Sequence, residues 1–276
     1  AGCATPPVNY TAADAPYAAP LVRVAAARPV IGLVLGAGGS RGFAHVGVLK
    51  AFEQAGIDAD VIVGVSSGAV VATLHAGGMR AAALETAALE IEDNDLLDFT
   101  MFGSGIIEGG RLQDYINDML KNRPIELLSK PFAAVAAERL TNRMAIFNRG
   151  NTGLALRASA SVPRLFWPVL IRGTEYVDGG MASRVPASVA RDMGADIVIA
   201  VDVSWRGSVD AQQADVVIRP QTVRSRITDF SHKLANLAAG EEAALAVVPQ
   251  VKALLARVAA EKSRALQVGA AQVGAM

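Results

Sequence analysis

The stretch DVIVGVSSGAVVATLHAGG, residues 60–78, joins a short apolar run to a helical pattern through a turn that contains two serines. Residues 60–65 are apolar and few, which is typical of a buried strand. Residues 67–78 predict a helix that ends at a pair of glycines. A strand that turns sharply into a helix is the basic unit of an α/β fold.

The turn carries the pattern G-x-S-x-G, with Ser66 at its centre between Gly64 and Gly68. Flanking glycines remove the Cβ atoms that would clash in such a turn, and the central residue is strained. The Ser66 hydroxyl would stand at a helix N-terminus, where the helix dipole favours developing negative charge. Ser67 would point into the first helical turn as a capping residue. The pattern predicts Ser66 as a nucleophile; the alternative is a tight turn without chemistry.

Alternating strands and helices continue along the chain. Further apolar runs predict strands at 29–36, 132–138, 144–147, 195–203 and 214–220, and helical patterns cover 41–56 and the chain from about 227. Strands that are apolar on both faces favour a parallel sheet with helices on both sides. We therefore expect one α/β domain over 30–276, with a helical C-terminal part at 227–276.

The composition narrows the class of partner. The chain has 276 residues, is 52% hydrophobic and 19% charged, and has a formal net charge of +0. A neutral chain argues against non-specific nucleic-acid binding, so we expect no nucleic-acid partner. No stretch of 18 mainly apolar residues is free of charges and helix breakers, so we expect no transmembrane helix.

Residues 1–29 are rich in proline and alanine and predict a semi-rigid tether. Cys3, the single cysteine, follows small residues as at the end of a bacterial lipoprotein signal. It predicts lipid attachment, with a free terminal thiol as the alternative. The expected location is the cell envelope, on a bacterial membrane facing the periplasm; the alternative is the cytoplasm.

A glycine-rich loop, GAGGSRG at 36–42, follows the first predicted strand and opens a helix. Backbone N–H groups of Gly38 and Gly39 could face a small concavity and stabilise an oxyanion. The rival is a dinucleotide loop, G-x-G-x-x-G, but it would need glycine where Arg41 stands. It also needs an acidic residue after the second strand, which here ends at the serine turn.

The proton acceptor for Ser66 is harder to find, because the chain has three histidines. Only His232 follows the serine at the distance that a Ser-acid-His order requires. The carboxylate in TEYVDGG, Asp178, stands at the end of a short predicted strand before two glycines. It is either a general base or part of an Asp-Gly hairpin turn. Spacing leaves both interpretations open.

From about Val30 to Val203 the chain resembles the bacterial patatin-like phospholipase family. Five motifs carry the resemblance in the family's order: GLVLGAGGSRGFAHVGVLKAFEQAGI (32–57), DVIVGVSSGAVVA (60–72), LRASASVPRLFWPV (156–169), EYVDGGMASRVP (175–186) and GADIVIAVDV (194–203). One departure is MASRVP at 181–186, where the family commonly has an Asn before Pro-Val-Pro. The departure bears on the support of the loop near Asp178.

The resemblance implies a three-layer α/β/α sandwich with a central, mainly parallel sheet. It implies a Ser66–Asp178 dyad without histidine, an oxyanion hole at Gly38 and Gly39, and an Arg41 that supports this loop or meets a lipid phosphate. The implied activity is lipid acyl hydrolysis of the phospholipase A, lysophospholipase or carboxylesterase type, through an acyl-serine and without metal or other cofactor. The implied partner is a phospholipid or another acyl-ester lipid, with peripheral membrane contact through the lipidated N-terminus.

The segment LLDFTMFGSGII at 96–107 combines apolar side chains with glycines and predicts a flap or a wall for the acyl chain. The candidate acyl-site residues are Phe99, Met101, Phe102, Ile106, Ile107, Phe166 and Trp167. Two alternatives to the dyad enzyme stay open: an α/β-hydrolase that uses Ser66, Asp178 and His232, and a non-catalytic lipid-binding or scaffold module.

Overall fold

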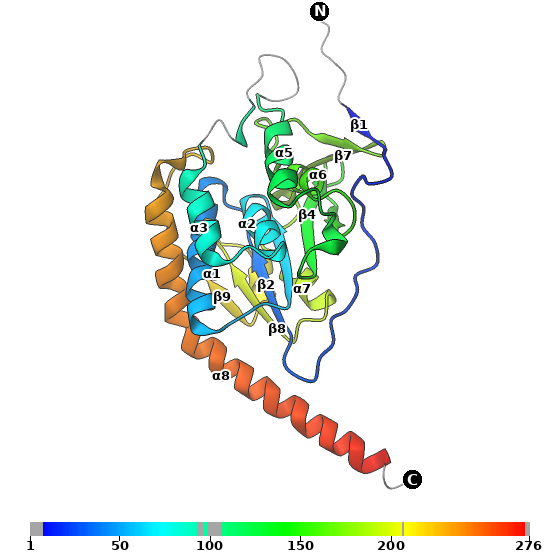
Figure 1. Ribbon diagram of the computed structural model, residues 1–276, viewed down its shortest axis with the longest axis vertical. Coiled ribbons are helices and arrows are strands. Elements are labelled where there is room, and N and C mark those ends of the chain that lie inside the picture. The colour runs from blue at the N-terminus through cyan, green and yellow to red at the C-terminus, as the bar shows by residue number, and fades with distance from the viewer. Residues whose placement is uncertain (1–7, 93–95, 99–105, 206, 274–276) are drawn as a thin grey trace, which may run out of the picture.

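The computed structural model describes residues 8–92, 96–98, 106–205 and 207–273, which form one mixed sheet flanked by helices (Figure 1). The strands are β1 (Asn9–Tyr10), β2 (Ile31–Leu35), β3 (Val61–Val65), β4 (Phe132–Glu138), β5 (Met144–Phe147), β6 (Val169–Ile171), β7 (Thr174–Asp178), β8 (Ile197–Val201) and β9 (Val216–Ile218). The α-helices are α1 (Phe43–Ala55), α2 (Ser67–Ala76), α3 (Ala81–Glu90), α5 (Gly110–Met119), α6 (Thr152–Ala160), α7 (Ala187–Asp192) and α8 (Lys233–Val273). Short 3-10 helices are η1 (Gly39–Gly42), η2 (Ile125–Leu127), η3 (Gly179–Met181), η4 (Asp210–Gln213) and η5 (Phe230–His232).

The sheet has the order β1-β6-β7-β4-β3-β2-β8-β9, and β5 also pairs with β4. Neighbouring strands from β4 through β9 are parallel, so the carboxyl ends of β2 and β3 lie at one edge. The glycine loop and the serine turn meet at this edge. Strand β7 runs antiparallel to β4 and places Asp178 opposite Ala136. An antiparallel strand thus brings Asp178 to the edge where parallel strands bring Ser66.

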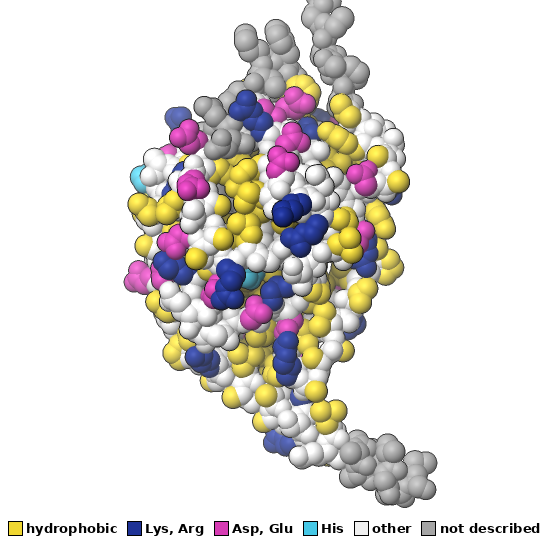
Figure 2. All heavy atoms as spheres, viewed as in Figure 1, with side chains coloured by type: hydrophobic (Ala, Val, Ile, Leu, Met, Phe, Trp, Pro, Cys, Tyr) yellow, Lys and Arg dark blue, Asp and Glu magenta, His cyan; other side chains and the backbone are white. Residues whose placement is uncertain are grey.

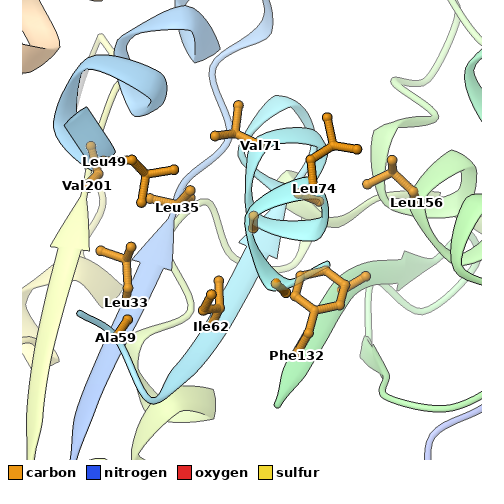
Figure 3. Packing of buried hydrophobic residues seen from close by; sticks show 14 of the residues in the cluster. Leu33, Leu35, Leu49, Ala59, Ile62, Val71, Leu74, Phe132, Leu156 and Val201 are labelled. Atoms are coloured by element: carbon orange, nitrogen blue, oxygen red, sulfur yellow. The ribbon is translucent and has the colours of Figure 1, made fainter. Parts of the chain in front are cut away.

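Helices cover both faces of the sheet. Successive residues of a strand point to opposite sides, so apolar strands present apolar side chains on each face for the helices to cover. Leu33 and Leu35 of β2 belong to the larger core cluster beneath α1 and α2, whereas Val34 belongs to the cluster beneath α7. Figure 3 shows the larger cluster, in which Leu33 lies below Leu49 of α1 and Phe132 lies below Leu74 of α2. The expected α/β/α arrangement with a mainly parallel sheet is confirmed.

The first part of α8 packs closely along α1. A Cβ atom on Gly47 would lie 2.0 Å from the Leu237 carbonyl oxygen, and one on Gly240 would lie 1.9 Å from the Ala44 oxygen. Glycine is needed at both positions because a larger side chain would push the two backbones apart. The helix contains Pro249, bends along its length and extends past the body of the molecule (Figure 1).

One helix contrasts with the expectation that no segment could span a membrane. By length and apolar composition the stretch Phe230–Val268 qualifies, as do core helices of many soluble proteins. Within it Leu237, Ala244 and Val251 are buried in the larger core cluster. This packing makes the first part of α8 an element of the domain.

Residues 8–29, predicted as part of a tether, lie along the surface of the domain (Figure 1). Strand β1 pairs in parallel with β6, and the Val24 N–H donates to the Met193 carbonyl at 2.8 Å. The Arg28 guanidinium forms an ion pair with Asp60 at 2.5 Å. The attachment uses mainly backbone hydrogen bonds, which leave no periodic pattern in the sequence. Cys3 lies outside the described residues.

Candidate active site

Ser66 connects β3 to α2 in a strained backbone conformation. Its φ of 55° and ψ of −128° lie in a region that non-glycine residues rarely adopt. Such a conformation costs about 1–3 kcal/mol and persists only where its surroundings hold it. The Ser66 N–H donates to Ser159 Oγ at 3.0 Å, and the Ser159 hydroxyl donates to the Val135 carbonyl at 2.6 Å. Strand β4 and helix α6 therefore hold the serine turn in place.

The glycines on either side of the turn are required by close packing. A Cβ atom on Gly64 would lie 2.5 Å from Ala69 Cα, and one on Gly68 would lie 2.2 Å from the Leu35 carbonyl oxygen. These contacts allow α2 to start directly against β2 and β3. The structure thus supplies the physical reason for the G-x-S-x-G pattern.

Asp178 ends β7 beside this turn, and the residue is only 6% exposed. Its Oδ1 accepts a hydrogen bond from the Gly180 N–H at 2.7 Å, and its own N–H donates to the Ser161 carbonyl at 2.8 Å. Oδ2 is buried without a hydrogen-bond partner among the described residues. An acceptor oxygen that is held in place and left unpaired is suited to receive a proton.

Burial raises the pKa of the Asp178 carboxyl from 3.8 to about 6. The nearby Ser66 hydroxyl, the Gly180 N–H and the positive charge of Arg184 each lower this pKa and offset part of the rise. The contact with Ser66 lies outside full hydrogen-bond geometry, since Oδ2 has no such partner. The carboxylate is ionised at neutral pH and is a stronger base there than an exposed aspartate.

The glycine loop lines the same cavity and has two backbone N–H groups without a hydrogen-bond acceptor among the described residues. Among the described residues, the N–H groups of Gly38 and Gly39 donate no hydrogen bond, and both glycines line the cavity that contains Ser66 and Asp178. Arg41 fixes the loop, because its Nε donates to the Val203 carbonyl at 2.8 Å. Ser40 adds a second tie through its N–H, which donates to the Ile227 carbonyl at 2.9 Å.

The site cavity has a volume of about 460 Å³ and a cationic rim. Arg41, Arg184 and Arg226 line it, together with Trp205, which is 54% exposed. The guanidinium groups of Arg41 and Arg224 lie over the Trp205 ring, 4.9 and 5.2 Å from its centroid. Of these rim residues only Arg41 was assigned a role from the sequence, although Arg184 also lies in one of the quoted motifs. The others come from loops whose convergence no local pattern reveals.

None of the chain's three histidines lines the site cavity. His45 is buried, and its Nε2 lies 2.8 Å from the Gly36 carbonyl; burial lowers its pKa to about 4, so the neutral ring supports the glycine loop. His75 lines a different cavity, beside Asp58 and Lys130. His232 belongs to η5. Within the described ranges, no group of three or more His, Cys, Asp and Glu side chains is placed to hold a metal ion.

The predicted acyl-site residues do not come together at this cavity. Ile107 and Phe166 are buried with Leu97 in a separate small cluster, Ile106 is 52% exposed, and Trp167 donates its N–H to the Ile107 carbonyl. None of the four described candidates lines the site cavity. Phe99, Met101 and Phe102 lie outside the described residues.

Comparisons with known proteins agree with this architecture. A profile of the patatin-like phospholipase family matches residues 33–191. An uncharacterized NTE family protein of Mycobacterium tuberculosis is 33% identical over 190 residues, which cover 68% of this chain and 52% of that protein. A patatin-like phospholipase domain-containing protein of Caenorhabditis elegans is 35% identical over 188 residues, or 65% of this chain and 14% of that protein.

Two solved structures share the fold. VipD from Legionella pneumophila superposes with a TM-score of 0.61 at 12% identity, covering 82% of this chain and 67% of VipD. The type III effector ExoU superposes with a TM-score of 0.52 at 18% identity, covering 80% of this chain and 53% of ExoU. The chain spans about half the length of the mycobacterial relative. The matching profile and these relatives show that the chain belongs to the patatin-like phospholipase family, a family of lipid hydrolases.

Proposed function

We propose that the protein is a serine hydrolase of acyl-ester lipids that uses Ser66 and Asp178 as a catalytic dyad. The observation that carries the proposal is the single cavity that joins a strained serine, a buried aspartate with a raised pKa and two free backbone donors. A fold element without chemistry would not need all three together. Strain, burial and unpaired donors each cost stability, and they coincide where they can serve a reaction.

The reaction begins when Ser66 Oγ attacks the ester carbonyl while Asp178 accepts the serine proton. The negative charge that develops on the carbonyl oxygen is stabilised by the N–H groups of Gly38 and Gly39. The carbon–oxygen bond to the alcohol breaks, the alcohol leaves with the proton from Asp178, and an acyl-serine remains. Water then attacks the acyl-serine, gives a proton to Asp178 and releases the fatty acid, and the proton returns to Ser66.

The arginines at the rim of the cavity favour a substrate with an anionic head group. Arg184 and Arg226 make no ion pair among the described residues, and both line the cavity. Guanidinium groups match the geometry of phosphate oxygens, so a phosphodiester could be held while the ester carbonyl lies at Ser66. We therefore propose phospholipids or lysophospholipids as the substrate class, in preference to uncharged esters.

The alternative of a Ser-His-Asp hydrolase has no support from the position of the histidines. His232 would have to reach the cavity that Ser66 and Asp178 line, and it does not line it. The His232→Ala variant separates the two schemes. The dyad predicts unchanged turnover, whereas a triad predicts loss of turnover in a protein that remains folded.

Fatty-acid release from mixed micelles tests the proposal, with phosphatidylglycerol and triacylglycerol compared at equal surface concentration. We expect faster release from the phospholipid, and a loss of about 10³-fold or more in Ser66→Ala and Asp178→Asn. Arg184→Gln should lower the rate on phosphatidylglycerol more than the rate on triacylglycerol. Equal rates on both lipids in the wild type would contradict the head-group assignment. Full activity of Ser66→Ala would contradict the mechanism.

A further inference from the structure

A second cavity, formed by apolar side chains, lies beside the active site between α1, α2 and α3. Its walls include Val46, Val71, Leu74 and Leu84, and Phe43 and Phe230 stand at its edge. On the face shown in Figure 2, hydrophobic side chains gather in a band over α2, between α3 and α5. No charged side chain lines this cavity among the described residues. With about 100 Å³, it has less than a quarter of the 460 Å³ of the site cavity, which suits a narrow chain and excludes a head group.

This apolar cavity adjoins the cavity that contains the catalytic residues. Gly39, whose N–H is one of the two oxyanion donors, lines both cavities. Ser67, the residue directly after the nucleophile, lines the apolar one. A group bonded to Ser66, with its carbonyl oxygen at the glycine loop, thus has an apolar space next to it on the other side of Gly39.

We infer that the apolar cavity is the subsite for the acyl chain of the substrate, an assignment that rests on the proposed hydrolase function. The hydrocarbon chain enters past Gly39 and lies between α2 and α3, while the head group stays at the arginine rim of the site cavity. This location differs from the segment around Ile107 and Phe166 that the sequence suggested. The two cavities divide the substrate according to polarity, since one has arginines and the other only apolar walls and two hydroxyl groups.

The wall of the subsite combines packed aromatic rings with small side chains. The Phe43 and Phe230 rings pack edge to face with centroids 5.4 Å apart, and the Lys233 ammonium lies 5.9 Å from the Phe43 ring. Ala87 and Ala88 of α3 also line the cavity, and they leave room because their side chains are small. Residues at these two alanine positions should therefore set the length of chain that is accepted.

The test is the ratio of kcat/KM for p-nitrophenyl octanoate to kcat/KM for p-nitrophenyl acetate. Each methylene group that is buried contributes about fourfold, so displacement of three methylenes by Ala88→Phe should lower the ratio about 60-fold. Ala83→Phe is the matched control, because Ala83 is exposed on the same helix. It should leave the ratio unchanged. Phe230→Ala opens the edge of the cavity and should shift the preference toward longer chains.

The results of these assays distinguish failure of the subsite assignment from failure of the proposed hydrolase function. Wild-type protein that hydrolyses neither ester and releases no fatty acid from phosphatidylglycerol would overturn both. Wild-type turnover with the same ratio in Ala88→Phe, Ala83→Phe and Phe230→Ala would overturn the subsite and leave the hydrolase intact. Should Ala88→Phe fail to fold, Phe230→Ala still decides the question, because an unchanged chain-length profile in that variant contradicts the assignment.

Discussion

The buried carboxylate of Asp178 should lower the stability of the protein in a manner that depends on pH. The pKa of its carboxyl is about 6 in the folded protein, against 3.8 for an ordinary aspartate such as the unfolded chain carries. The folded state therefore binds the proton more tightly than the unfolded state. Stability must then fall as pH rises between these two values. The difference of about 2.2 units corresponds to about 3 kcal/mol once the pH is well above 6.

Asp178→Asn removes this cost, because the amide has the shape of the protonated acid and carries no charge. The free energy of unfolding should rise by about 3 kcal/mol at pH 8, by about 1.6 kcal/mol at pH 5, and by little near pH 4. The Gly180 N–H keeps a side-chain oxygen as its acceptor in the variant. The protein thus gains stability as it loses its general base, as is common at active sites.

Urea unfolding at pH 8 and pH 5, followed by circular dichroism, measures both differences. Asp192→Asn is the matched control, since Asp192 is exposed at the end of α7, and it should change stability little and equally at both pH values. A destabilised Asp178→Asn at pH 8, or a stabilisation that is the same at both pH values, would refute the reasoning from burial.

Further predictions concern turnover, support of the serine turn and membrane attachment. At pH values below about 6, the kcat/KM for a soluble ester should decrease by up to about tenfold per pH unit, because protonated Asp178 accepts no proton from Ser66. A flat profile down to pH 4.5 would exclude Asp178 as the base. Ser159→Ala leaves the Ser66 N–H and the Val135 carbonyl unpaired, so urea unfolding should show a loss of about 1–3 kcal/mol, whereas no loss would remove Ser159 from the support of the turn. Gly68→Ala places a Cβ atom 2.2 Å from the Leu35 carbonyl and should cost about 1–3 kcal/mol or more, measured in the same way. We propose that Cys3 is acylated in a bacterial envelope, and labelling with a palmitate analogue should mark the full-length protein and not Cys3→Ser; an unlabelled protein would leave the N-terminus without this anchor.

The central strands were predictable because their signal is local. Strands β2, β3, β4 and β8 are short runs that are apolar on both faces, as a sheet covered by two helical layers requires. The serine turn was predictable for a related reason. A Cβ atom at position 68 would lie 2.2 Å from the Leu35 carbonyl oxygen, so only glycine fits there. The glycine in the sequence therefore indicates the close packing.

Features made by distant segments left no such signal. Strand β1 joins the sheet edge through backbone pairing, which any sequence can make. Ser159 supports the nucleophile through one hydroxyl, and a lone serine in a helix does not indicate such a role. The arginine rim and the apolar cavity collect residues from several elements, so they exist only after the sheet and its helices have assembled.

Reaction with a fluorophosphonate, followed by intact mass and peptide mapping, tests the central assignment most directly. The probe modifies a serine only when the serine is activated, and it does not require knowledge of the lipid substrate. We predict a single adduct on Ser66 in the wild type, much slower labelling of Asp178→Asn, and an unchanged rate in His232→Ala. An adduct on another serine, no adduct on the folded wild type, or equal rates in the wild type and Asp178→Asn would contradict a Ser66–Asp178 dyad.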